Sequence, residues 1–273
     1  MTPPADERSP IDSLGDPVVR AMRYVGGLSL LIADTAVWSF RGLVSPKVRF
    51  GWEALAIQMV RVGVRSLGIV ALVQTFIGVI LALQMTPPLA TFGQEAMIAN
   101  IIGVAGFRML GPIITAIVLS GYAGASIAAE LGTMVVAEEI EAMEAMALNP
   151  VRFLVVPRVL ATCVMTILLS AIADLMIALG GYITCRLVLA SDVWVNYWPN
   201  MRDQLTFSDL GTGLIQAAVF GVLISAIACF EGLRVRGGAK GVGRATTMTV
   251  VYSIVSIIAS ACVCTMIFYI FDF

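Results

Sequence analysis

The sequence of 273 residues has no histidine, and charged residues make up only 13% of it. A typical soluble domain carries about 25% charged residues, so this composition excludes an ordinary water-soluble enzyme. Without histidine, the chain lacks the most common general base and the most common metal ligand, which argues against catalysis and against a metal site. The net charge of −1 also gives no basic excess of the kind that indicates nucleic-acid binding.

Cysteines are few, and their pattern fits neither a disulfide framework nor a metal site. They are odd in number, they lie inside apolar segments, and no two are spaced as C-x-x-C. We interpret them as small buried apolar side chains. They are Cys163, Cys185, Cys229, Cys262 and Cys264.

What the sequence does contain is long apolar runs, with 59% hydrophobic residues overall. Four runs carry no charge and are long enough to cross a hydrocarbon core of about 30 Å as helices. A fifth run is interrupted by Asp174 and Arg186. The predicted fold class is therefore all-α integral membrane, with five transmembrane helices. The spans are expected at about residues 66–86, 111–129, 159–189, 210–230 and 246–270.

The basic residues favour one orientation of these spans. If the N-terminus is cytoplasmic, 14 of the 17 basic residues fall in cytoplasmic segments, as the positive-inside rule requires. Arg108, Arg186 and Arg202 are the exceptions. An odd number of spans then places the C-terminus on the opposite side of the membrane.

The first 65 residues precede the first span. Residues 1–17 are polar and rich in proline, lack the pattern of a signal peptide, and are expected to form a disordered cytoplasmic tail. Residues 18–65 hold two short stretches, 24–40 and 50–65, that combine apolar residues with arginines in or beside them and predict interfacial, or elbow, helices. The alternative is that residues 24–43 form a sixth span.

The main acidic cluster follows the second span. Good helix formers from 135 to 148, followed by Asn149-Pro150, predict a cytoplasmic helix of about three turns. One face carries an apolar stripe with glutamates beside it at i, i+3 spacing. This helix either lies solvated in a loop or docks into a basic cleft of a partner. The stripe comprises Ile140, Met143 and Ala147, and the glutamates are Glu138, Glu141 and Glu144.

Three further features could contribute to function. Asp174 is costly inside a span and either makes a structural hydrogen bond or couples transport to protons. The apolar segment 96–107 is too short to span and predicts a re-entrant or interfacial helix, with Arg108 as the one cation at an outward mouth. The basic, glycine-rich connection 231–247 lacks P-loop spacing, because Lys240 is followed by Gly241, so the chain is not expected to hydrolyse ATP.

Four motifs together resemble one family. They are Leu110-Gly-Pro112, the run Ala123-Gly-Ala-Ser-Ile-Ala-Ala-Glu-Leu-Gly132, the segment 139–150 with Pro157-Arg158, and Gly241-Val-Gly-Arg-Ala-Thr-Thr247. From about residue 25 to its end, the chain resembles the MlaE/YrbE-type permeases, the membrane subunits of ABC transporters that work with MCE-domain proteins.

The resemblance implies a homodimer in the bacterial inner membrane, two cytoplasmic ABC ATPase subunits that bind ATP-Mg, a periplasmic MCE oligomer and a phospholipid substrate. No cofactor is expected in this chain. The acidic segment becomes the helix that couples the ATPase to the permease, through Glu138, Glu139, Glu141, Met143 and Glu144. The implied lipid-binding residues are Leu81, Gln84, Leu89, Phe92 and Arg108. The implied cytoplasmic-loop motif is Gly241, Gly243 and Arg244.

We therefore predict a permease subunit that moves phospholipid, or a similar lipid, between the inner membrane and periplasmic MCE carriers. Two alternatives stay open at this point. One is a proton-coupled secondary transporter that uses Asp174, and the other is a membrane scaffold that transports nothing.

Overall fold

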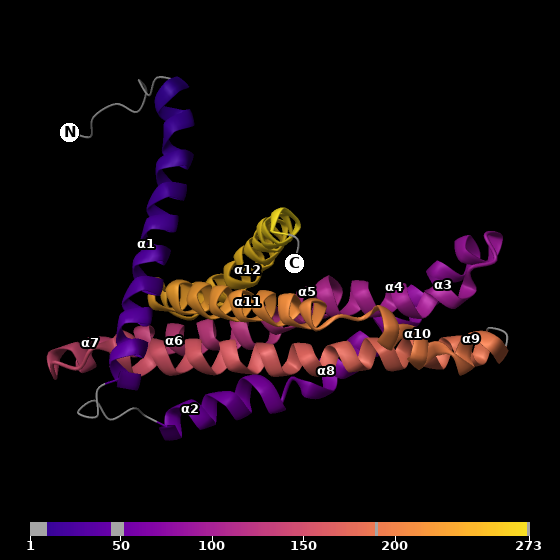
Figure 1. Ribbon diagram of the computed structural model, residues 1–273. Helices are drawn as coiled ribbons and strands as arrows, with labels where there is room; N and C mark the ends of the chain where they lie inside the picture. Colours follow the sequence, from indigo (N-terminus) through magenta and orange to yellow (C-terminus); the bar gives the residue numbers. More distant parts are fainter. Residues whose placement is uncertain (1–9, 45–51, 189–190, 272–273) are drawn as a thin grey trace.

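The computed structural model describes residues 10–44, 52–188 and 191–271, and all regular structure within them is helical (Figure 1). Short π-helical segments join several of the α-helices, so that consecutive helices often form one longer rod. The α-helices are α1 (Pro10–Val44), α2 (Trp52–Met59), α3 (Leu67–Thr91), α4 (Ile98–Ala105), α5 (Gly111–Leu119), α6 (Ala125–Val136), α7 (Glu139–Ala145), α8 (Val156–Val188), α9 (Ser191–Val195), α10 (Tyr197–Gln204), α11 (Phe207–Leu233) and α12 (Gly238–Ile270).

Five helical stretches in the described residues are long and apolar enough to cross a membrane, which confirms the predicted fold class. Each helical stretch is longer than the predicted span. Hydropathy marks only the part that crosses hydrocarbon, whereas a helix continues until its backbone is capped or turned. The stretches are Trp52–Thr91, Glu95–Val136, Val151–Val188, Phe207–Leu233 and Gly238–Ile270.

Helix α8 is central to the bundle and packs against α3 on one side and α11 on another. Two glycines bring the α3 and α8 backbones together. A Cβ atom added at Gly78 would lie 2.1 Å from the carbonyl oxygen of Ile177, and one added at Gly180 would lie 2.2 Å from that of Thr75. Small residues allow this close approach, which increases van der Waals contact between helices in a membrane.

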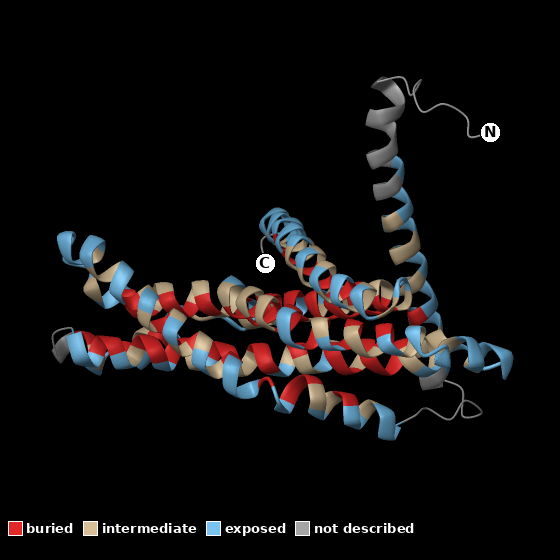
Figure 2. Cartoon of the chain, turned by 180° about the vertical axis from the view of Figure 1, so that it is seen from behind, coloured by how far each residue is buried: buried red, intermediate tan, exposed pale blue. Residues whose placement is uncertain are grey.

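Buried residues lie along the whole bundle (Figure 2), and they pack into two clusters. The larger cluster joins α5, α6, α8 and α11, with Leu119, Ile127 and Phe220 fully buried. The smaller cluster joins α3, α4, α8 and α10 around Ile102 and Tyr197. The two clusters therefore hold opposite ends of the same bundle. We call these the α7 end, which carries α7 and the link 234–237, and the α10 end, which carries α9 and α10 (Figure 1).

The N-terminal helix α1 runs across the bundle near the α7 end instead of along it (Figure 1). It is not among the five stretches that meet the length and hydropathy of a span, so the alternative of a sixth span at residues 24–43 is not supported. The helix begins at Pro10, which corrects the expected disordered tail 1–17 for residues 10–17. Residues 1–9 lie outside the described residues.

Helix α1 docks on the bundle through Tyr24, whose ring centroid lies 5.1 Å from those of Phe230 and Tyr252.

The second predicted interfacial stretch forms α2 and the π-helical segment Val60–Val64, which pack along α8 and turn at Ser66 into α3. Residues 50 and 51 of that prediction lie outside the described residues.

The structure also differs from the predicted re-entrant or interfacial helix at 96–107. Its residues form α4 and part of the π-helical segment Gly106–Leu110, and they continue directly into the second span. Helix α4 can extend this span because it packs on α10.

Candidate functional site

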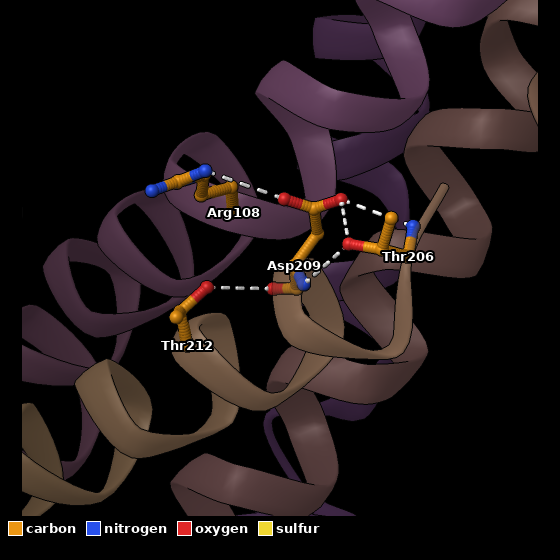
Figure 3. Close-up of polar contacts among 4 residues, drawn as sticks. All are labelled: Arg108, Thr206, Asp209 and Thr212. Carbon is orange, nitrogen blue, oxygen red and sulfur yellow. Dashed lines mark hydrogen bonds and ion pairs between the residues drawn. The ribbon is translucent and has the colours of Figure 1, made fainter. Parts of the chain in front are cut away.

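At the α10 end, Arg108 faces Asp209 (Figure 3). Arg108 lies in the π-helical segment Gly106–Leu110, and its Nη1 is 3.4 Å from Oδ1 of Asp209 in the first turn of α11. The arginine side chain is 36% exposed and the carboxylate 10%. Arg108 is therefore not an isolated charge, because a carboxylate from a distant helix pairs with it. Its place as the one cation at an outward mouth stays a prediction.

Asp209 is held in place by a capping box at the start of α11 (Figure 3). The backbone N–H and the hydroxyl of Thr206 donate to Oδ2 of Asp209 at 3.0 and 2.7 Å, and the backbone N–H of Asp209 donates to the Thr206 hydroxyl at 3.4 Å. The sequence reasoning missed this residue, although Thr206-Phe-Ser-Asp209 before an apolar run is a helix-start signature. The cap leaves Oδ1 of Asp209 directed at Arg108.

The residues implied as lipid contacts fall into two environments. Leu81 and Leu89 on α3 are half-buried and pack against the smaller cluster, as does Phe107 next to Arg108. Gln84 and Phe92 are exposed, and 77% of the surface of Phe92 is accessible to solvent. Part of the implied pocket is thus core of this chain, and part faces outward.

The α10 end is also braced by a buried tyrosine. The hydroxyl of Tyr197 donates to the carbonyl oxygen of Ala178 at 3.0 Å, and its ring packs edge-on against Tyr182 and Trp198. Burial raises the pKa of Tyr197 well above its ordinary value, so the phenol stays neutral and keeps its donor proton. This contact ties α10 to α8 beside the Arg108 region.

Asp174 lies inside the bundle and is 1% exposed. Its Oδ1 atom has no hydrogen-bond partner among the described residues, so the structural hydrogen bond we expected is absent at that oxygen. A Cβ atom added at Gly111 would lie 1.9 Å from Oδ1, which shows that only a glycine leaves space for this carboxyl group. Nearby, Nε2 of Gln74 donates to the Gly111 carbonyl oxygen at 3.0 Å and to the Thr115 hydroxyl at 2.9 Å.

At the α7 end, the predicted three-turn helix 135–148 is two separate pieces. Helix α6 ends at Val136, and α7 covers only Glu139–Ala145. Glu138 and Ala147 adopt left-handed backbone angles, with φ of 60° and 58°, and these residues turn the chain at both ends of α7. Helix propensity alone could not place these breaks, because the residues on both sides are good helix formers.

The glutamates of this segment are all exposed, whereas Met143 is half-buried. Beside them lies a cavity of about 520 Å³ between α7 and the end of α11, with Ile140, Leu148 and Leu233 among its apolar lining residues and Glu144 at its edge. Exposed acids beside an apolar groove are suited to a partner that presents basic and apolar side chains. The exposed residues are Glu138, Glu139, Glu141 and Glu144.

The glycine-rich motif predicted in the last cytoplasmic loop lies in a helix instead. Gly241, Gly243 and Arg244 belong to the first two turns of α12, and only residues 234–237 link α11 to α12. Gly241 is needed for close approach, because its Cβ would lie 2.1 Å from the carbonyl oxygen of Arg236. The composition resembled a loop, but the glycine serves the tight turn before the helix.

The sequence is similar to those of several known proteins. The family model described as "Permease MlaE" matches residues 55–267. The chain is 33% identical over 260 residues to a probable ABC transporter permease protein of Rickettsia bellii, covering 94% of this chain and 97% of the relative. It is 30% identical over 244 residues to the intermembrane phospholipid transport system permease protein MlaE of Haemophilus influenzae, covering 89% and 91%. It is 33% identical over 220 residues to protein TRIGALACTOSYLDIACYLGLYCEROL 1, chloroplastic, of Arabidopsis thaliana, covering 77% and 60%.

Proposed function

Because the chain belongs to the MlaE permease family, we propose that it moves phospholipid, or a similar two-tailed lipid, between the bacterial inner membrane and periplasmic MCE-domain carriers. It is a multi-pass permease subunit of an ABC transporter, and ATP-Mg is bound and hydrolysed by a separate ATPase subunit. The observation that carries the proposal is the match of this family to all five spans of the bundle.

The assembly we propose is a homodimer with two ATPase subunits at the α7 end and an MCE oligomer at the α10 end. The N-terminus is then cytoplasmic and the C-terminus periplasmic. The exposed glutamates of α7 and the groove beside them support ATPase docking at that end. The excess of basic residues in the segments assigned to the cytoplasm supports the orientation.

The lipid site in this proposal includes Leu81, Gln84, Leu89, Phe92 and Arg108 at the α10 end. Exposed Phe92 and half-buried Leu81 and Leu89 offer apolar surface to acyl chains, at roughly 0.8 kcal/mol for each buried CH₂ group. Arg108 shares its charge with Asp209, so its attraction for one particular headgroup is reduced. Acyl chains therefore contribute most of the affinity, and headgroup selectivity at this site is expected to be loose.

The direct test is purification of the tagged protein from its native membrane in mild detergent, followed by mass spectrometry of the intact complex. We expect a dimer with two ATPase chains, an MCE oligomer and bound phospholipid. Recovery of the chain alone and free of lipid would contradict the proposal.

One observation favours the alternative of a proton-coupled transporter, namely the buried Asp174 oxygen without a partner. We nevertheless expect Asp174→Asn to retain lipid transport, because asparagine fills the same volume beside Gly111. The variant tests proton coupling because asparagine, unlike the aspartate carboxyl group, does not take up and release a proton. Transport into acceptor vesicles and ATPase activity would be measured together in the reconstituted complex. Lost transport with unchanged ATPase activity would instead support proton coupling through Asp174.

A further inference from the structure

A cavity of about 390 Å³ lies between the π-helical segment after α2 and the helix that ends as α6, away from the α10 end. Its lining is unusually polar for a membrane bundle. The polar side chains that line it are Arg61, Arg65, Tyr122, Ser126, Glu130 and Thr133. Val62 and Ile127, which are 2% and 1% exposed, form part of its wall.

The charges at this cavity do not balance. Glu130 is its one carboxylate, and both of its oxygens are engaged. Oε2 pairs with Arg61 and Oε1 lies 3.0 Å from Nη2 of Arg158. Arg158 is 5% exposed and also donates to the Leu154 carbonyl oxygen at 2.9 Å, so it is fixed in the bundle. Arg65 lines the same cavity and has no ion-pair partner within the described parts of the chain. Two guanidinium groups thus pair with one carboxylate, and the guanidinium group of Arg65 adds a further positive charge to the same cavity.

The polar side chains from the second span form a single stripe. Tyr122, Ser126 and Glu130 follow one another at i, i+4 spacing, and the hydroxyl-bearing side chains of Tyr122 and Ser126 are exposed. Exposed polar groups on a membrane-spanning helix are costly in hydrocarbon unless something polar faces them. Across the cavity the facing side chains are Arg61 and Arg65. The stripe and the arginines together are therefore suited to an anionic, hydrogen-bonding ligand.

We propose that this cavity binds the phosphate group of an anionic phospholipid from the leaflet at the α7 end. Guanidinium groups hold phosphate oxygens with paired, charge-assisted hydrogen bonds, and the two hydroxyl groups can donate to phosphate or glycerol oxygens. Val60, Val64 and Leu67 lie exposed beside the arginines and give the acyl chains an apolar surface. The site is separate from the lipid contacts proposed at the α10 end. It deepens the proposed function by supplying a second lipid position, although binding here does not require transport.

The test is photo-crosslinking of the full-length protein in nanodiscs with phosphatidylglycerol that carries a diazirine near its headgroup. We expect the lipid to label the segment from Tyr122 to Thr133, as mapped by peptide mass spectrometry. Arg65→Ala should lower this labelling about tenfold, the effect of losing one charge-assisted hydrogen bond. Arg23→Ala is the matched control, because Arg23 is an exposed arginine on α1 that does not line the cavity. It should leave the labelling unchanged.

A second variant distinguishes loss of lipid binding from loss of folding. Ser126→Phe fills the cavity and keeps every charge, so it should also remove the labelling, with size-exclusion chromatography as the check of the fold. Labelling that is insensitive to Arg65→Ala and Ser126→Phe would overturn the proposal. So would labelling that glycerol 1-phosphate displaces, because the ligand would then be a soluble phosphate. Labelling near Arg108 in the same sample tests the α10-end lipid site separately, so either site can fail alone.

Discussion

Replacing Gly180 with valine is expected to remove the folded protein from the membrane. Gly180 on α8 and Gly78 on α3 face each other's helices, and a Cβ at position 180 would lie 2.2 Å from the backbone carbonyl oxygen of Thr75. A backbone atom cannot rotate away as a side chain can, so the two helices must separate. We expect the free energy of unfolding to fall by more than about 3 kcal/mol, because inserting even single methylene groups into a packed core costs about 1–3 kcal/mol of stability.

The measurement is the yield and melting temperature of a fluorescent fusion after detergent extraction and size-exclusion chromatography. Gly68→Val is the control, because Gly68 lies on α3, the helix that packs against Gly180, and a Cβ there meets no atom within 4 Å. Gly78→Val should behave like Gly180→Val, since its Cβ would lie 2.1 Å from the Ile177 carbonyl oxygen. Equal yields for Gly68→Val and Gly180→Val would show that α3 and α8 do not approach as closely as described.

The five spans could be predicted from sequence because the cost of charge in hydrocarbon leaves charge-free runs of a defined length. Their ends could not. The second helical stretch begins at Glu95, well before the predicted residue 111, because α4 packs on α10 and continues into α5. The link between α11 and α12 is likewise shorter than its glycine content suggested. Both boundaries depend on contacts between segments distant in sequence.

The polar pairs also depend on contacts between distant segments, which the sequence alone could not predict. Arg108 and Asp209 are 101 residues apart, and Arg61 and Glu130 are 69 apart, so nothing local links the partners. The capping box at Thr206 was a local signal and could have identified Asp209 as an ordered carboxylate. Its arginine partner could not be inferred in that way. For Glu130 the sequence held no local sign that two arginines would share it.

The proposed ATPase docking at α7 leads to the second large expected effect. The double substitution Glu141→Lys with Glu144→Lys should abolish ATP-driven lipid transport and detach the ATPase. Both glutamates are exposed on α7, and Glu144 borders the adjacent groove. A partner cleft of basic character would then face two lysines in place of two carboxylates. Charge pairs across interfaces contribute several kcal/mol, so we expect affinity for the ATPase to fall about 100-fold or more.

The affinity would be measured by pull-down of the ATPase with the tagged permease, and transport by lipid transfer in proteoliposomes. The matched control is Glu95→Lys with Asp203→Lys, which makes the same change in net charge at the α10 end. Because that end lies opposite α7, the control should retain the ATPase. A membrane scaffold without transport would tolerate both double variants equally. ATPase association that survives reversal at Glu141 and Glu144 would therefore remove α7 as the docking element. Selective loss of association together with loss of transport would support α7 as the helix through which the ATPase couples to the permease.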